Sequence, residues 1–340
     1  SALDLGFAEL EALHGSDGAL TAFESHRAAI DWIERTVNRE RIACDFSRVN
    51  GYLFEPLGSS SETVHAEWEA IRRCQIEGVE LLPRLPVDFH DSGPCLRFAG
   101  QGQIEPLSYL EGLARAVERR GGKIYGRTAA ASVTEDRLCA VETESGPRVS
   151  SASVIVATDA PVVDRVAISA RQFAYRSYAI AAHVRRGRVP RGLYWDSSDP
   201  YHYVRLAGTG DGATELLIIG GEDHKVGHAH DAAERFEKLE AWARSVFPMI
   251  EGVSHRWSGQ ILNSSDGLGF IGRHPSSRGA VFIITGDTGT GITNGTIGGM
   301  ICADLIRGRA NAWSGLYEPS RLIAGSAGAV ARENLDAAAQ

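Results

Sequence analysis

The sequence predicts a mixed fold with α/β and α+β parts, and three observations carry this prediction. Residues 279–305 hold a β-branched and aromatic run, a glycine-rich turn and an apolar stretch at helical spacing, which together predict a strand, a turn and a helix. Residues 171–220 contain several short runs of strand composition, typical of an antiparallel sheet. The length of 340 residues is enough for about two domains.

The composition excludes several classes of partner. The formal net charge is −8, so the chain has no basic surplus to neutralise nucleic-acid phosphates or an anionic membrane. No apolar run approaches the ~20 residues of a membrane-spanning helix, and we expect a soluble, cytoplasmic protein. The five cysteines form no Cys-x-x-Cys or Cys-x-His pair, which predicts reduced thiols and no metal site. We interpret His224, His228 and His230 as solvated loop residues rather than metal ligands.

Apolar residues at helical spacing predict helices in several parts of the chain. The first is expected to begin at residue 1, and the fourth stops at Gly121-Gly122, where glycine favours a C-terminal cap. Prolines restrict 79–98 to short edge strands or irregular structure, and 100–106 is expected to turn. The predicted helices cover 1–15, 16–41, 61–77, 107–120, 231–247 and 291–305. The predicted strands cover 51–54, 123–125, 131–135, 138–144, 149–158, 175–184, 193–195, 201–206, 215–220, 253–261 and 281–285, and an anchored piece covers 313–321.

Four glycines, at 286, 289, 291 and 295, follow the strand at 281–285. Glycine admits backbone conformations that other residues avoid, and it leaves amide groups uncovered for a ligand. The N-terminus of the following helix suits an anion, or an electron-rich ring that gains negative charge on reduction. Asn294 stands where the third glycine of the dinucleotide fingerprint would be, so a tight and closely packed strand-to-helix turn is the alternative.

Two further strands carry candidate residues. The strand at 149–158 ends in Ala157, Thr158 and Asp159, small residues at a position where ligands of open α/β sheets bind. An ordinary buried strand with a proline stop is the alternative. In the strand at 201–206, alternation places Tyr203 and Arg205 on the same face.

Several motifs, taken in their order along the chain, resemble a known family. They are VIVATDAP at 154–161, Trp257-Ser-Gly-Gln, DGLGFIG at 266–272 and TGDTGTGITNGTIGG at 285–299. This set resembles the FAD-dependent oxidoreductases of the D-amino acid oxidase, or glycine oxidase-like, family (DAO). Further matches are similar to the branch that often carries a Rieske iron-sulfur domain at its carboxyl end. They are Cys44-Asp-Phe46, Leu96-Arg-Phe98, QIEP at 103–106, IIGGEDHKVG at 218–227 and LYEPSR at 316–321.

The resemblance implies a discontinuous domain organisation. An FAD/NAD(P)-binding-type domain would comprise 1–41, 105–161 and 263–325, interleaved with an antiparallel-sheet substrate domain at 42–104 and 162–262, before a tail at 326–340. The family's strand-GxGxxG-helix unit and its ribose-binding acidic residue have no counterpart in these 340 residues. We therefore expect an incomplete FAD-binding domain in a truncated chain, with a weaker hold on FAD.

The resemblance also implies which residues approach the FAD cofactor and the substrate. The strands around Tyr52, Tyr203 and Trp257 would face the substrate, with aromatic packing on the sheet as the alternative for the two tyrosines. Ala157, Thr158 and Asp159 would approach the flavin nucleotide. Gly286, Asp287, Thr288, Gly289, Thr290, Gly291, Ile292 and Thr293 would lie against the flavin ring and pyrophosphate.

The expected reaction is oxidation of a C–N bond by hydride transfer from a small-molecule amine to FAD. Amino-acid-oxidising members of the family usually place a carboxylate-binding arginine after the Trp-x-Gly strand, whereas residues 260–263 here are Gln-Ile-Leu-Asn. An amine without an α-carboxylate is therefore the expected substrate. No side chain is assigned as a catalytic base. Because the chain holds no Cys-x-His pair, the electron acceptor, of the Rieske type or another, would lie outside it.

Two other functions compete with this hypothesis. A nicotinamide-dependent dehydrogenase would need its own strand-GxGxxG-helix unit, and none is visible in the sequence. An inactive or partial subunit or fragment of a flavoenzyme would bind no flavin, and the absent glycine-rich front favours that alternative.

Overall fold

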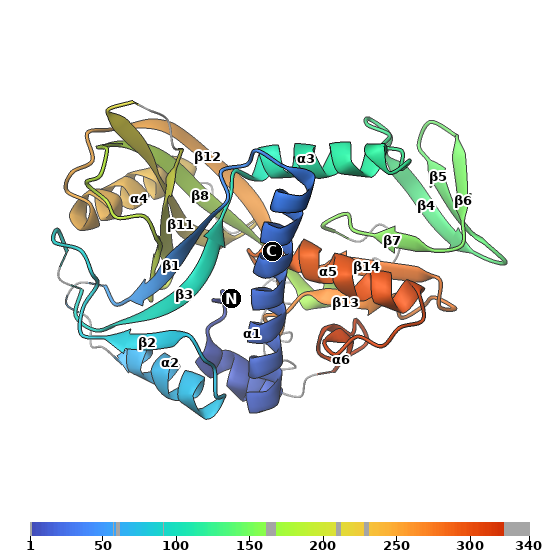
Figure 1. Ribbon diagram of the computed structural model, residues 1–340, viewed down its shortest axis with the longest axis horizontal. Coiled ribbons are helices and arrows are strands. Elements are labelled where there is room, and N and C mark those ends of the chain that lie inside the picture. Colours follow the sequence, from blue (N-terminus) through green and yellow to red (C-terminus); the bar gives the residue numbers. More distant parts are fainter. Residues whose placement is uncertain are drawn as a thin grey trace.

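The computed structural model describes residues 2–56, 58, 62–90, 92–160, 168–208, 212–227 and 231–322 (Figure 1). A large sheet and a small sheet lie on either side of the long helix α1, which confirms the predicted mixed α/β and α+β fold. The tail at 326–340 lies outside the described residues. The helices are α1 (Phe7–Glu40), α2 (Glu62–Arg73), α3 (Pro106–Arg119), α4 (Ala232–Val246), α5 (Gly291–Ile306) and α6 (Ser314–Tyr317), with a 3-10 turn at Ser169–Arg171.

The large sheet is mostly antiparallel and has eight strands among the described residues. Helix α4 packs on one face, where Ile180, Val204 and Leu217 belong to a buried core. The other face turns toward α1 and the small sheet. In spatial order the strands are β12 (Gly252–Ser264), β8 (Gln172–Arg185), β11 (Thr214–Lys225), β10 (His202–Ala207), β9 (Leu193–Asp196), β1 (Ser47–Phe54), β3 (Cys95–Gln103) and β2 (Val79–Leu82).

The small sheet brings together two strand ends that are far apart in the sequence. Its strands are β13 (Phe270–Arg273), β14 (Val281–Thr285) and β7 (Val154–Val156). Strands β14 and β7 are parallel, with Ile283 opposite Val156, so both carboxyl ends meet at one edge of the sheet. Helix α5 starts just after β14, at this same edge. A separate three-stranded meander is formed by β4 (Ala130–Glu135), β5 (Cys139–Thr143) and β6 (Arg148–Ser151).

The start of the first helix differs from the prediction. Residues 2–6 are not helical, and α1 begins at Phe7 because the Glu67 carboxylate accepts the N–H groups of Phe7 (2.6 Å) and Ala8 (3.0 Å). A carboxylate at this position satisfies the free amides of a helix start and complements the helix dipole. Gly15, at φ 71° and ψ 170°, interrupts α1, which agrees with the predicted break between two helical segments.

Two other expectations were wrong. The stretch at 100–106 does not turn, because β3 continues to Gln103 with a bulge in which Gly100 adopts a φ of 66°. Residues 123–125 form no strand, and the side chains of Ile124 and Tyr125 are exposed. No helix of the described ranges is long and apolar enough to cross a bilayer.

The predicted anchor at 313–321 is held by a buried ion pair. Arg321 donates to both carboxylate oxygens of Asp266 at 2.8 Å, and also to the backbone carbonyls of Leu268, Gly269 and Tyr317. The side chains of Arg321 and Asp266 are only 7 % and 3 % exposed. A paired, fully hydrogen-bonded charge of this kind fixes the end of the described chain against β13.

We expect Arg321→Met to lower the free energy of unfolding by roughly 3–5 kcal/mol, because it leaves the buried Asp266 carboxylate without its partner. Denaturant-induced unfolding measures the change. Arg309→Met is the matched control, since Arg309 pairs with Asp304 while more than half exposed and should change stability by less than about 1 kcal/mol. Equal effects of the two substitutions would contradict the structural role given to Arg321.

Candidate functional site

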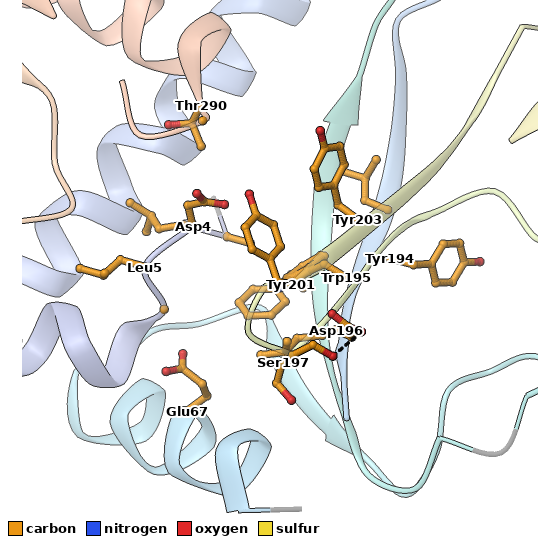
Figure 2. A pocket seen from close by; sticks show the side chains of 18 of the residues that line it. Asp4, Leu5, Glu67, Tyr194, Trp195, Asp196, Ser197, Tyr201, Tyr203 and Thr290 are labelled. Carbon is orange, nitrogen blue, oxygen red and sulfur yellow. Dashed lines mark hydrogen bonds between the residues drawn. The ribbon is translucent and has the colours of Figure 1, made fainter. Parts of the chain in front are cut away.

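A cavity of about 760 Å³ lies between the segment before α1, the turn before α5 and the large sheet (Figure 2). Its volume is in the range of small-molecule and cofactor sites. Three separate parts of the chain therefore face one space. The segment before α1 contributes Asp4, Leu5 and Gly6, and the turn before α5 contributes Gly289 and Thr290. Strands β9 and β10 contribute Leu193, Trp195, Tyr203 and Arg205.

The turn after β14 has left-handed backbone conformations and is tied by side chains. Gly286, Thr288 and Gly289 adopt φ values of 68°, 46° and 75°. The side-chain amide of Asn294 donates to the carbonyl of Asp287 at 2.8 Å and to Oγ1 of Thr290 at 2.7 Å. Asn294, which replaces the third glycine of the dinucleotide fingerprint, therefore holds the turn in shape.

The N-terminus of α5 presents free donors beside the cavity. The backbone N–H groups of Gly291, Ile292 and Thr293 have no acceptor among the residues that the structure describes, and Thr290 makes no side-chain cap. These donors and the positive end of the helix dipole together suit an anion or an electron-rich ring.

Carboxylates surround this turn. Asp4 lies against Gly289, where a Cβ atom would be 3.2 Å from Oδ2 of Asp4. The Asp4 side chain is exposed toward the cavity, while the protein packed around it still withdraws its carboxylate from bulk solvent. This burial raises the pKa of Asp4 to about 6, although a hydrogen bond from Tyr201 acts in the opposite direction. Burial, and next the negative charge of Asp159, raise the pKa of Asp287.

Aromatic side chains form the opposite wall of the cavity. Tyr203 and Trp195 are direct cross-strand partners on β10 and β9. The Tyr203 ring lies over Gly220, where a Cβ atom would approach it to 2.1 Å, and its hydroxyl is 3.2 Å from that of Ser177. Glycine is required at 220 because any side chain would displace this ring.

A buried hydrogen-bond network fixes the conformation of the chain between β9 and β10. The Asp196 carboxylate accepts from the backbone N–H of His202 (2.7 Å), from its ring Nδ1 (3.0 Å) and from Nε1 of Trp242 (3.1 Å). The His202 and Trp242 rings stack at 4.1 Å. Because His202 is fixed in this way, its neighbour Tyr201 points into the cavity toward Asp4 (Figure 2). The sequence analysis missed this network, and no motif signals it.

The three residues expected on the substrate side lie in different places. Tyr203 lines the cavity. Tyr52 is buried on the α4 side of the large sheet and stacks on Tyr194 at 5.4 Å, so the packing alternative accounts for its contacts. Trp257 lies on β12 with 44 % of its surface exposed and does not line the cavity.

The residues expected near the cofactor gather at one edge of the small sheet. Ala157, Thr158 and Asp159 are exposed at the carboxyl end of β7, and Thr285 at the end of β14 donates a hydrogen bond to the Asp159 carbonyl. Ile292 packs against the cluster around Ile42. Gly289 and Thr290 line the cavity directly, while the rest of the expected set adjoins them in the turn and the first turn of α5: Gly286, Asp287, Thr288, Gly291 and Thr293.

The described residues contain no group of three or more histidine, cysteine, aspartate or glutamate side chains that could hold a metal ion. His224 stacks on Tyr178 at 5.7 Å. His228 and His230 lie outside the described residues.

Comparison with known proteins agrees with the family resemblance of the sequence motifs. The sequence profile of the DAO family, described as FAD dependent oxidoreductase, matches residues 10–305. The chain is 28 % identical over 308 residues to the putative Rieske 2Fe-2S iron-sulfur protein YhfW of Bacillus subtilis, covering 90 % of this chain and 59 % of that protein. It is 26 % identical over 297 residues to gamma-glutamylputrescine oxidoreductase of Escherichia coli, covering 82 % of this chain and 66 % of the relative. The chain thus spans about three-fifths to two-thirds of these proteins.

Solved structures share the fold. Glycine oxidase from Geobacillus kaustophilus superposes with a TM-score of 0.72 at 19 % identity, over 90 % of this chain and 84 % of that one. L-proline dehydrogenase from P. horikoshii gives a TM-score of 0.75 at 16 % identity, over 90 % and 83 %. The family profile covers most of the chain and agrees with the resemblance found in its motifs. This chain belongs to the DAO family of FAD-dependent oxidoreductases.

Proposed function

We propose that this chain takes part in FAD-dependent oxidation of a C–N bond in an amine, with the reaction taking place in the cavity before α5. The observation that carries the proposal is the meeting of three features around one space. They are the turn at Gly289, which carries no side chain there, the carboxylate of Asp4, and the aromatic side chain of Tyr203 on the opposite side. The names of the relatives, an amine oxidoreductase and oxidases of amino acids, support this reaction class.

The residues around the turn fit a flavin ring. Gly289 has no side chain to cover the turn, and its only near neighbour is the Asp4 carboxylate, while the free N–H groups at the start of α5 would hold the electron-rich edge of the ring. The nearby carboxylates of Asp159 and Asp287 would repel a pyrophosphate, which favours the ring over the phosphates at this turn. We assign Ala157–Asp159 and Gly286–Thr293 to the cofactor side. When bound, FAD supplies the acceptor for two electrons and the hydride.

Asp4 is placed to handle the proton of the substrate. Amines arrive mostly as ammonium ions, whose nitrogen has no lone pair to assist loss of the α-hydride. With a pKa of about 6, the Asp4 carboxylate is ionised at neutral pH and accepts that proton. The neutral amine would then have a lone pair on nitrogen to form C=N, while bound FAD would supply the acceptor for the hydride and both electrons of the C–H bond. Water adds to this iminium, and cleavage of the C–N bond yields a carbonyl compound and the released amine.

The reduced cofactor must pass its electrons on. The printed name of the Bacillus relative supports a Rieske-type acceptor outside this chain, and dioxygen is the other candidate. Such a cluster would take the two electrons one at a time, whereas dioxygen would take both.

We expect Gly289→Val to weaken FAD binding at least about 10-fold, since valine is strained at a φ of 75° and its side chain would meet Asp4. Reconstitution with FAD, followed by visible absorption and fluorescence titration, measures the affinity. Gly308→Val is the matched control, because Gly308 has a similar φ of 69° but open space around it and lies past the other end of α5.

Equal FAD affinity of these two variants would contradict the assignment of the turn. A wild-type chain that stays colourless with excess FAD would overturn the proposed function and support the partial-subunit alternative.

We expect the rate of flavin reduction by an amine to rise as the pH rises through about 6, because only the ionised Asp4 accepts a proton. Asp4→Asn should abolish this limb of the profile and slow reduction by about 100-fold or more. Anaerobic stopped-flow absorbance measures both. Glu9→Gln, at another carboxylate of the cavity lining, should keep the limb, and its loss there would contradict the role given to Asp4.

A further inference from the structure

Arg205 is a half-buried cation in the cavity wall without an ion-pair partner in the described part of the chain. It lies on β10, on the same face as Tyr203, and lines the cavity. No carboxylate of the described residues lies within 4.0 Å of its guanidinium nitrogens. Burial lowers the pKa of Arg205, while Glu105 and Asp45 act in the opposite direction from a distance.

The nearest acidic groups have other roles. The Glu105 carboxylate caps α3, where it accepts the backbone N–H of Ser108 at 2.7 Å. Asp45 adopts a left-handed backbone conformation, with φ 49°, in the connection before β1. Both carboxylates stabilise the charged form of Arg205, but neither forms an ion pair with it. A guanidinium withdrawn from water but left unpaired is costly, unless a ligand supplies the anion.

Asp4 and Arg205 place opposite charges in different parts of the cavity lining. Tyr201 contacts Asp4, and Arg205 lies four residues further along the strand on the same face. At roughly 3.3 Å per residue of extended chain, Tyr201, just before β10, and Arg205 are about 13 Å apart. The cavity thus has a carboxylate beside the cofactor turn and a guanidinium at its other end, with Tyr203 and Trp195 between them.

We propose that Arg205 binds a carboxylate of the substrate several bonds away from the amine that is oxidised. The substrate class is then an amine with a distal carboxylate, such as an ω-amino acid, rather than an α-amino acid or a simple alkylamine. The proposal rests on the proposed function for the identity of the reacting group. A carboxylate matches the planar donor pair of arginine, which can form a bidentate hydrogen bond to both of its oxygens.

Binding can be measured without the cofactor. Trp195 lines the same cavity, so its fluorescence reports on ligands beside Arg205, and Trp195→Phe identifies its share of the signal. The probes are 6-aminohexanoate, hexylamine, which replaces the carboxylate with a methyl group, and inorganic phosphate. We expect 6-aminohexanoate to bind the wild-type protein about 10- to 100-fold more tightly than hexylamine. Arg205→Met should remove this preference.

The matched control is Arg176→Met. Arg176 lies on β8, which is separated from β10 by β11; it donates to the Ser258 hydroxyl at 3.0 Å and does not line the cavity. It should leave the preference unchanged. If Arg205→Met fails to fold, Arg205→Lys keeps the charge but loses the paired donors, and should retain only part of the preference.

Flavin reduction separates this proposal from the proposed function. In the FAD-loaded protein, Arg205→Met should raise KM for 6-aminohexanoate about 10- to 100-fold, with little change in kcat and none for hexylamine. Equal losses for both amines, or phosphate binding more tightly than 6-aminohexanoate, would overturn the carboxylate assignment. Arg205-dependent binding without flavin reduction by either amine would support the anion site and overturn amine oxidation.

Discussion

The candidate site depends on the carboxylate of Glu67, which joins α2 to the first turn of α1. By accepting hydrogen bonds from the amides of Phe7 and Ala8, it fixes the start of α1 directly after the turn at Asp4 and Leu5, and Asp4 lines the cavity. Gly6 has no room for a side chain there, because a Cβ atom would be 2.8 Å from Oε1 of Glu67. Burial raises the pKa of Glu67, so its ionised form depends on these two donated hydrogen bonds. The cap from Glu67 therefore fixes both the start of α1 and the position of Asp4 in the cavity lining.

A second property of the site is its uneven distribution of charge. The turn side holds Asp4 and Asp287, whereas Arg205 lines the cavity from β10. The aromatic side chains of Tyr203 and Trp195 line the cavity between them and carry no charge. Such a cavity would orient a zwitterionic amine with its nitrogen toward the cofactor turn. Orientation of this kind favours reaction because the reacting carbon is held near the acceptor.

The sequence predicted the helices and strands better than the tertiary contacts between them. The strand–turn–helix at 281–305 was confirmed because β-branched residues, glycines and helical spacing are all local signals. Asp4 was missed because residues 1–15 have helical spacing, while the cap that starts the helix later comes from Glu67, 60 residues away. Tyr52 was expected near substrate, but alternation defines two faces of a strand and does not tell which one packs on α4. Alternation placed Arg205 on the same face as Tyr203, as the structure has it, yet its lack of a counter-ion depends on neighbours from other strands.

Asn294 shows why a departure from a motif need not weaken a site. The third glycine of the dinucleotide fingerprint serves close packing between helix and strand. Here Asn294 is buried, and its amide closes the turn by donating to Asp287 and Thr290. A turn held from within by its own side chain has less need of a phosphate to order it, and its free amides stay available. The same substitution that removes the fingerprint thus keeps the turn in shape, which is compatible with the proposal that a ring gaining charge during the reaction binds there.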